Sequence, residues 1–206
     1  MRGRFITLEG IDGAGKSTHL EWIVQFLESR GIGVKSTREP GGTELGERVR
    51  ELILRGGAGL NPETETLLMF AARREHIDKV IEPSLASGSW VVCDRFTDAT
   101  FAYQSAGSGV SGSKVEQLEQ WVQEGLEPDA TILLDVAPEI GLARAVRGKR
   151  PDRFESEQIA FYERVRQAYL ERARAAPSRI SVIDASRPLA DIQKKLEVIL
   201  SAVCSK

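Results

Sequence analysis

The chain has 206 residues, of which 41% are hydrophobic and 28% are charged, and these proportions describe an ordinary globular protein of one domain. The formal net charge of −2 provides no general attraction to nucleic acids or to anionic membranes, so we expect neither as a partner. No apolar stretch approaches the length of a membrane span, and the first predicted strand starts too early to leave room for a signal peptide, which together indicate a cytoplasmic protein.

The N-terminal part predicts a strand, a glycine-rich loop and a helix. Residues 5–9 form a short apolar run typical of a buried strand, and residues 18–28 carry apolar side chains at helical spacing. Between them, residues 10–17 fit the pattern G-x-x-x-x-G-K-S/T at every fixed position. Glycines let backbone N–H groups close on phosphate oxygens, and the start of the helix adds a favourable dipole. This unit predicts binding of a nucleoside triphosphate.

Individual residues of this loop carry distinct chemistry. Lys16 would reach the outer phosphates, and the hydroxyl of Ser17 would hold Mg²⁺. The residues expected to hold the nucleotide are Gly10, Ile11, Asp12, Gly13, Ala14, Gly15, Lys16, Ser17 and Thr18.

The rest of the chain alternates between predicted strands and helices. Strands are expected within 31–37, 89–93, 131–134 and 180–183, and helices within 44–54, 62–85 (interrupted near Pro83), 114–124, 138–146, 157–175 and 188–203. This alternation predicts a single α/β domain over 1–206 with a three-layer, P-loop NTPase-type fold: a five-stranded parallel sheet with helices on both faces. Ligands should lie beyond the carboxyl ends of the strands, where Arg38, Asp94, Arg95 and Asp135 stand.

A phosphate-binding loop alone fits several classes of nucleotide-dependent protein. A GTPase needs an N-K-x-D segment to read guanine, and the sequence has none. A motor or transporter ATPase should carry an acidic pair after an apolar strand, but Asp135 is followed by valine. A small-molecule kinase needs arginines that clamp the acceptor and neutralise charge during transfer. Arginines in suitable segments are Arg38, Arg73 or Arg74, and Arg95.

Further motifs occur in a fixed order along nearly the whole chain. They are Phe5-Ile-Thr-Leu-Glu-Gly-Ile-Asp-Gly-Ala-Gly-Lys-Ser-Thr18, Arg38-Glu-Pro-Gly-Gly-Thr43, Phe70-Ala-Ala-Arg73, Asp94-Arg-Phe-Thr-Asp-Ala-Thr-Phe-Ala-Tyr-Gln104, Leu134-Asp-Val136, Asp152-Arg-Phe-Glu155 and Phe161-Tyr-Glu-Arg-Val-Arg166. This succession resembles the bacterial thymidylate kinases. The resemblance implies that the chain uses ATP and Mg²⁺ to phosphorylate dTMP to dTDP, a step in dTTP synthesis, and that it forms a homodimer.

The resemblance implies roles around the acceptor phosphate. Arg95 resembles the arginine that contacts the dTMP phosphate near the transferring group, and Arg38 resembles a second phosphate clamp. Asp94 would orient the site and, with Ser17, provide the metal environment.

For the sugar, Asp12 is similar to the loop carboxylate that contacts the 3′-hydroxyl. Tyr103 matches the tyrosine beneath the deoxyribose, where it would crowd a 2′-hydroxyl, and Phe154 matches an aromatic residue near the same sugar.

For the base, Arg73 resembles the arginine that donates to a thymine carbonyl, and Thr100 and Gln104 resemble neighbouring polar residues. The family usually has a phenylalanine four residues before this arginine. This chain has Met69 there and Phe70 next, and the sequence leaves open which of the two covers the base.

A basic segment near 143–156 resembles a small lid. Its basic residues are Arg144, Arg147, Lys149, Arg150 and Arg153. In one branch of the family the phosphate loop itself carries an arginine, at the position of Gly13. Because glycine cannot neutralise the γ-phosphoryl, we expect the lid to close over ATP and to supply Arg147 and Arg153, with Arg144 and Arg150 also contacting ATP.

Two alternatives remain open. Another nucleoside monophosphate kinase or a deoxynucleoside kinase could use the same scaffold, although Arg38 and Arg95 favour a monophosphate acceptor. A regulatory module that binds ATP without turnover is disfavoured by the intact Lys16. Apolar helix faces within 67–77 and 118–122 could supply the dimer interface.

Overall fold

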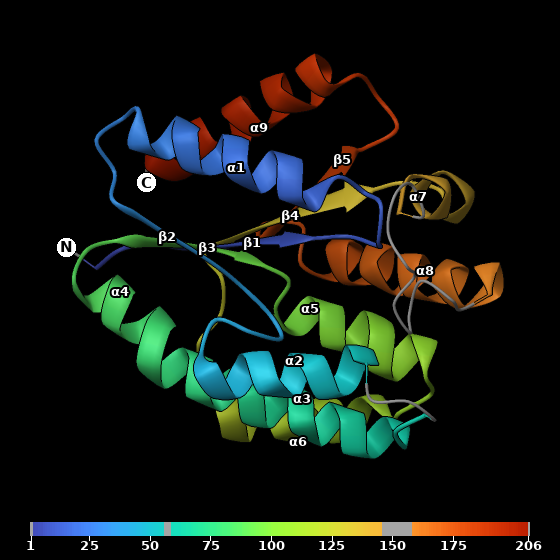
Figure 1. The fold of residues 1–206 in the computed structure, drawn as a ribbon. Helices are drawn as coiled ribbons and strands as arrows, with labels where there is room; N and C mark the ends of the chain where they lie inside the picture. Colours follow the sequence, from blue (N-terminus) through green and yellow to red (C-terminus); the bar gives the residue numbers. More distant parts are fainter. Residues whose placement is uncertain (1, 56–58, 146–157, 206) are drawn as a thin grey trace.

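A parallel sheet of five strands organises the residues described by this computed structural model, which are 2–55, 59–145 and 158–205 (Figure 1). The strands are β1 (Phe5–Glu9), β2 (Val34–Arg38), β3 (Trp90–Asp94), β4 (Ala130–Asp135) and β5 (Ile180–Asp184). They lie in the order β2-β3-β1-β4-β5, and every neighbouring pair is parallel. The predicted α/β fold with five parallel strands is confirmed.

Helices cover both faces of the sheet (Figure 1). One face is covered by α1 (Lys16–Glu28) and α9 (Leu189–Cys204), and the remaining helices are α2 (Glu44–Arg55), α3 (Pro62–His76), α4 (Glu82–Ala86), α5 (Thr97–Thr100), α6 (Gly112–Gln123), α7 (Pro138–Ala145) and α8 (Ile159–Ala175). None of the helices within the described ranges is long and apolar enough to span a bilayer.

The central strand β1 is fully buried because it has a strand on each side and helices on each face. Its Ile6 and Leu8 pack in one core with Ile23 of α1 and Leu196 of α9, and all four side chains are 0% exposed. This burial explains why the strand reads as a continuous apolar run. It also holds the phosphate loop, which follows β1 directly, on a rigid base.

The region predicted as one interrupted helix over 62–85 is continuous but changes its winding. A π-helical segment, η1 (Ile77–Ile81), joins α3 to α4, and the N–H of Glu82 donates to the carbonyl of Ile77, five residues earlier. Pro83 follows directly and has no N–H to give to the carbonyl four residues before it. The wider turn accommodates the proline without breaking the helix.

The sequence analysis predicted no helix between β3 and α6, and this was wrong. There α5 runs into a second π-helical segment, η2 (Phe101–Gly107). Asp98, Thr100 and Gln104 on this stretch are buried although they are polar. Because these polar groups face inward, the stretch lacks the apolar periodicity by which an amphipathic helix is usually found.

Candidate active site

The loop between β1 and α1 needs glycine at defined places. Gly10, Gly13 and Gly15 have φ angles of 140°, 74° and 89°, in the region that favours glycine. A Cβ on Gly10 would lie 2.5 Å from the carbonyl oxygen of Leu134, and a Cβ on Gly13 would lie 1.8 Å from that of Gly141. The backbone of the loop therefore packs directly against β4 and α7, and there is no room for a side chain at position 13.

Lys16 lies inside this loop. Its Nζ donates to the carbonyl oxygens of Gly10 and Ile11, at 3.0 Å each, and the side chain is 8% exposed. Burial and the nearby Arg95 lower the pKa of Lys16. The ammonium group is thus held where the loop and the first turn of α1 can share a phosphate group with it.

Arg95 connects the end of β3 to the phosphate loop. Its φ of 69° is unusual for a residue other than glycine. Nη2 donates to Oδ1 of Asp12 at 2.6 Å and to the hydroxyl of Tyr103 at 3.0 Å, and Nη1 donates to the hydroxyl of Tyr169 at 3.4 Å. Asp12 Oδ2 accepts from Tyr103 at 3.2 Å and from Tyr162 at 3.1 Å. Burial opposes ionisation of Asp12, but Arg95 and Lys16 hold its pKa below the ordinary value.

Glu9 is linked to Arg95 through the hydroxyl of Tyr169, which contacts both side chains. Its Oε2 accepts from the hydroxyl of Tyr169 at 2.9 Å, and its Oε1 accepts from the backbone N–H of Phe96 at 2.7 Å. Burial, with Asp98 nearby, raises the pKa of Glu9 to about 8. The sequence analysis assigned no role to Glu9, although a carboxyl group inside an apolar strand is itself a signal of a buried polar contact.

A cleft beside Arg95 is lined by five of the ten residues predicted to bind the acceptor. Its lining consists of Asp12, Glu39, Pro40, Arg50, Leu54, Met69, Arg95, Ala99, Tyr103 and Gln104. We call it the acceptor cleft. The sequence analysis missed Arg50. Its position on the inner side of α2, next to Val49 and Ile53, was the only sequence signal that it faces the cleft. Its Nη1 donates to the carbonyl of Pro40 at 3.1 Å.

Met69 and Phe70 point in different directions from α3. Met69 lines the acceptor cleft, whereas Phe70 is 1% exposed and packs with Val110, Val115 and Val122. Consecutive residues of a helix are about 100° apart around its axis, and here that rotation turns Met69 toward the cleft and Phe70 into the core. The interpretation of Phe70 as a substrate contact is therefore corrected: Phe70 is a core residue in this structure.

Arg73 and Thr100 lie behind the cleft and not among its lining residues. Arg73 is 1% exposed; its Nε donates to Oε2 of Glu39 at 2.7 Å, and its Nη2 donates to Oγ1 of Thr100 at 3.0 Å. The guanidinium also lies 4.8 Å from the ring centroids of both Phe70 and Phe96. These contacts order the wall of the cleft through Glu39, and direct contact with a base stays a prediction.

A second cleft lies on the side of Ser17, Arg38 and Asp94. Nη2 of Arg38 donates to Oε2 of Glu47 at 2.8 Å. Oδ1 of Asp94 is buried and has no hydrogen-bond partner among the described residues. A buried carboxylate oxygen without a donor, together with a serine hydroxyl in the same cleft, fits the oxygen ligands that Mg²⁺ prefers.

Within the described ranges, no three His, Cys, Asp or Glu side chains are grouped as a metal site. A Mg²⁺ ion at Ser17 and Asp94 would therefore take its other ligands from phosphate oxygens and water, as this ion commonly does.

The predicted lid residues are only partly described. Arg144 lies at the end of α7, where its Nη1 donates to the carbonyl oxygen of Ala185 at 3.0 Å, in the loop after β5. Arg147, Arg150, Arg153 and Phe154 lie outside the described residues, and their roles stay predictions. Asp135, at the end of β4, pairs through both carboxylate oxygens with Arg166 at 2.7 and 2.8 Å.

Comparison with known proteins agrees with this geometry. The sequence model of the family described as "Thymidylate kinase" matches residues 8–196. The thymidylate kinase of Methylobacillus flagellatus is 59% identical over 196 residues, which cover 95% of this chain and 96% of that protein. The thymidylate kinase of Nitrosomonas europaea is 57% identical over 199 residues, which cover 97% of this chain and 93% of that protein.

Solved structures give the same result. The crystal structure of thymidylate kinase from Ehrlichia chaffeensis matches with a TM-score of 0.79 at 35% sequence identity, covering 98% of this chain and 99% of that one. Family, relatives and fold thus agree over nearly the full length. The chain belongs to the thymidylate kinase family.

Proposed function

We propose that the family's reaction, transfer of the γ-phosphoryl group of ATP to dTMP, takes place in this chain between the 10–18 loop and the acceptor cleft. The observation that carries this proposal is the contact between Arg95 and Asp12, whose side chains meet at 2.6 Å. A guanidinium has five N–H donors, and three side chains occupy only part of them here. The remaining donors can bind the acceptor phosphate while the ion pair holds the arginine beside the loop.

On the donor side, the loop N–H groups and Lys16 would bind the phosphates of ATP. Ser17 and Asp94 would hold Mg²⁺, which neutralises phosphate charge when bound. The ammonium of Lys16 lies inside the loop, so it would stabilise the negative charge of the phosphoryl group during its transfer. Arg95 would act on the opposite side of that group, in an in-line arrangement with the acceptor oxygen.

On the acceptor side, Arg95 and Arg38 would bind the phosphate of dTMP. Asp12 and Tyr103 would meet the sugar, where the ring of Tyr103, which lines the cleft, would crowd a 2′-hydroxyl. Met69 would cover the base, since it lines the cleft at the family's aromatic position. Arg73 would reach the base only if its contacts with Glu39 and Thr100 rearrange, so we assign it first to ordering the cleft wall.

Arginines of the 143–156 segment would complete the site. Gly13 cannot carry a charged side chain, because its backbone packs against Gly141 of α7. The transition state still needs donors for its equatorial oxygens. Arg147 and Arg153 remain the proposed source on sequence grounds, and Arg144 and Arg150 the proposed further contacts to ATP.

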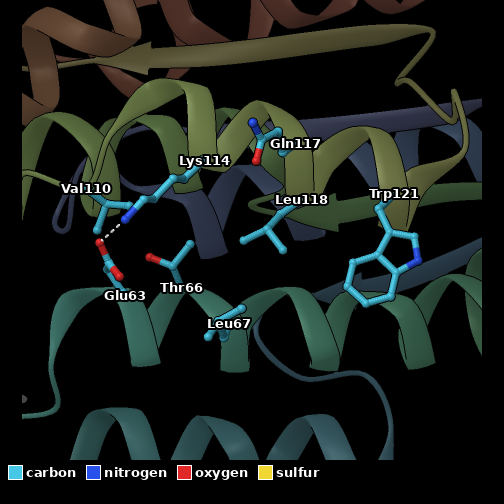
Figure 2. A pocket seen from close by; sticks show the side chains of 8 residues that line it. All are labelled: Glu63, Thr66, Leu67, Val110, Lys114, Gln117, Leu118 and Trp121. Carbon is cyan, nitrogen blue, oxygen red and sulfur yellow. Dashed lines mark hydrogen bonds and ion pairs between the residues drawn. The ribbon is translucent and has the colours of Figure 1, made fainter.

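A homodimer is proposed through the exposed faces of α3 and α6. Leu67 and Trp121 are 55% and 77% exposed, and with Leu118 they line an open groove (Figure 2). Lys114 pairs with Glu63 at one end of this groove at 2.5 Å (Figure 2). Large apolar side chains gathered on one face are typical of an interface.

Since ATP and dTMP are supplied inside the cell, the proposed compartment is the cytoplasm.

The experiment that tests the acceptor is a coupled assay of ADP release with ATP, Mg²⁺ and either dTMP or thymidine. Arg95 and Arg38 are the proposed contacts to the acceptor phosphate, so dTMP should be the better substrate by orders of magnitude. Equal or faster turnover of thymidine would favour the alternative, a deoxynucleoside kinase. ADP release that needs no acceptor would contradict both.

A further inference from the structure

Gln104 presents an unusual group to the acceptor cleft. It lies in η2, is 1% exposed and lines the cleft with Tyr103. Its Nε2 donates to Oε1 of Glu65 at 2.9 Å. Its Oε1 is buried and has no hydrogen-bond partner among the described residues. A buried amide oxygen without a donor is costly in a folded protein and is best explained by a ligand that supplies one.

Glu65 determines which end of this amide faces the cleft. An amide group can turn over and exchange its oxygen for its nitrogen, so nothing in Gln104 itself decides the orientation. A carboxylate only accepts hydrogen bonds, and therefore only the NH₂ end of Gln104 can face Glu65. Glu65 is 0% exposed and cannot turn to solvent instead. The oxygen of Gln104 is thus left as the group available to a bound base.

We propose that Glu65 is a positioning residue that selects the base of the acceptor by holding Gln104 with its carbonyl oxygen toward the cleft. The inference rests on the proposed function, since it needs a pyrimidine nucleotide in the acceptor cleft. A base with an N–H on its pairing edge, as thymine has at N3, satisfies the oxygen. Cytosine has an unprotonated nitrogen at that place, so two acceptors would face each other.

Stabilisation of the N-terminus of α3 does not explain why Glu65 is a buried acidic residue. Acidic residues in a first turn favour the helix, and α3 has two of them, Glu63 and Glu65. Glu63 fulfils this role from an exposed position and pairs with Lys114 on the surface. Glu65 is buried on the other side of the helix, where a charge is costly unless it has partners. The same comparison provides a matched control, because both residues have the same side chain in the same helical turn.

The test compares Glu65→Gln with Glu63→Gln, using dTMP and dCMP as acceptors in the ATP-coupled assay. In Glu65→Gln the new amide can donate as well as accept, so Gln104 is free to turn over and to offer N–H to cytosine. We expect the ratio of kcat/KM for dTMP over dCMP to fall by at least about tenfold, because discrimination by an unpaired buried group is lost. Glu63→Gln should keep the wild-type ratio.

A second variant guards against misfolding of the first. Gln104→Leu removes the amide entirely and should lower the same ratio even if Glu65→Gln cannot be purified. A folded Glu65→Gln protein that keeps the wild-type ratio, or that loses both activities equally, would overturn the inference. So would a wild-type ratio in Gln104→Leu. Absence of dTMP turnover in the wild type would overturn the proposed function as well, which separates the two failures.

Discussion

Arg95 and Asp12 stand 83 positions apart in the chain, yet Nη2 of the arginine lies 2.6 Å from Oδ1 of the aspartate. The sheet order explains this contact, because β3 and β1 are neighbours and Asp94 is in register with Leu8. The N–H of Arg95 also donates to the carbonyl of Leu8 at 3.0 Å. The topology of the sheet therefore places an arginine from the end of β3 directly against the phosphate loop.

Lys16→Ala should abolish phosphoryl transfer while the protein stays folded. Among the described residues, the ammonium of Lys16 donates to the loop carbonyls of Gly10 and Ile11, and its removal relieves a buried charge. Loss of such a contact should raise the barrier by several kcal/mol and lower kcat at least about a hundredfold. The coupled assay measures turnover, thermal melting measures folding, and the exposed Lys195→Ala is the control. Turnover within about tenfold of the wild type would remove Lys16 from the mechanism.

Replacing Arg147 and Arg153 together by alanine should lower kcat by orders of magnitude and change dTMP affinity little. Arg38 and Arg95 are the proposed contacts to the acceptor phosphate, while position 13 of the loop has no room for a compensating side chain. Stopped-flow turnover and dTMP titration calorimetry separate the two effects. A double variant that keeps kcat, or that loses mainly dTMP binding, would contradict the assignment of these arginines to ATP.

Glu9→Gln should remove a pH dependence of stability. Burial and Asp98 raise the pKa of Glu9 from 4.5 to about 8, so between these values the folded protein binds a proton that the unfolded chain releases. The free energy of unfolding must then fall as pH rises through this window, by up to about 1.4 kcal/mol per pH unit for one proton. Asp12 changes the free energy of unfolding in the opposite direction, and only at lower pH, because its pKa in the folded protein is lowered from 3.8.

Urea unfolding between pH 5.5 and 8.5 measures this difference. The wild type should lose stability relative to Glu9→Gln as the pH rises, and the two curves should converge or cross. Two parallel curves would show that Glu9 is ionised throughout and that its surroundings compensate its charge.

Leu67→Glu should shift the proposed homodimer toward monomers. The side chain lines the groove between α3 and α6 together with Leu118 and Trp121, and a carboxylate buried there in a dimer would be costly without a partner (Figure 2). Sedimentation equilibrium gives the association constant. Val198→Glu is a matched control, because Val198 is 70% exposed on α9, which lies across the sheet from α3 (Figure 1). Equal effects of both substitutions, or a monomeric wild type, would exclude this face as the interface.

Local features of this fold could be predicted from the sequence. The apolar runs of β1, β3, β4 and β5 lie close to their predicted positions because buried parallel strands are continuously apolar. The phosphate loop could be identified because its glycines are required by backbone geometry within a few residues. The strand ends then indicated the edge of the sheet at which Arg38, Asp94 and Arg95 lie.

Contacts between distant segments could not be predicted in the same way. Glu9, Arg50 and Glu65 look like ordinary charged residues until the fold shows which of them are buried and what they touch. The choice between Met69 and Phe70 depends on the rotation of α3 about its axis, which is determined by packing on α2, α6 and η2. The helix over 97–107 was missed because its inward face is polar.

The most direct test of the proposed mechanism is a product measurement on Arg95→Ala. Wild type, Arg95→Ala and the exposed control Arg174→Ala are each incubated with ATP, Mg²⁺ and dTMP, and ADP and dTDP are quantified by ion-exchange chromatography. We expect the wild type and Arg174→Ala to form one dTDP for each ADP, and Arg95→Ala to form both products at least about a hundredfold more slowly, since it lacks the donor that joins acceptor and phosphate loop. Formation of dTDP by Arg95→Ala at the wild-type rate, or ADP without dTDP in the wild type, would contradict the proposed mechanism.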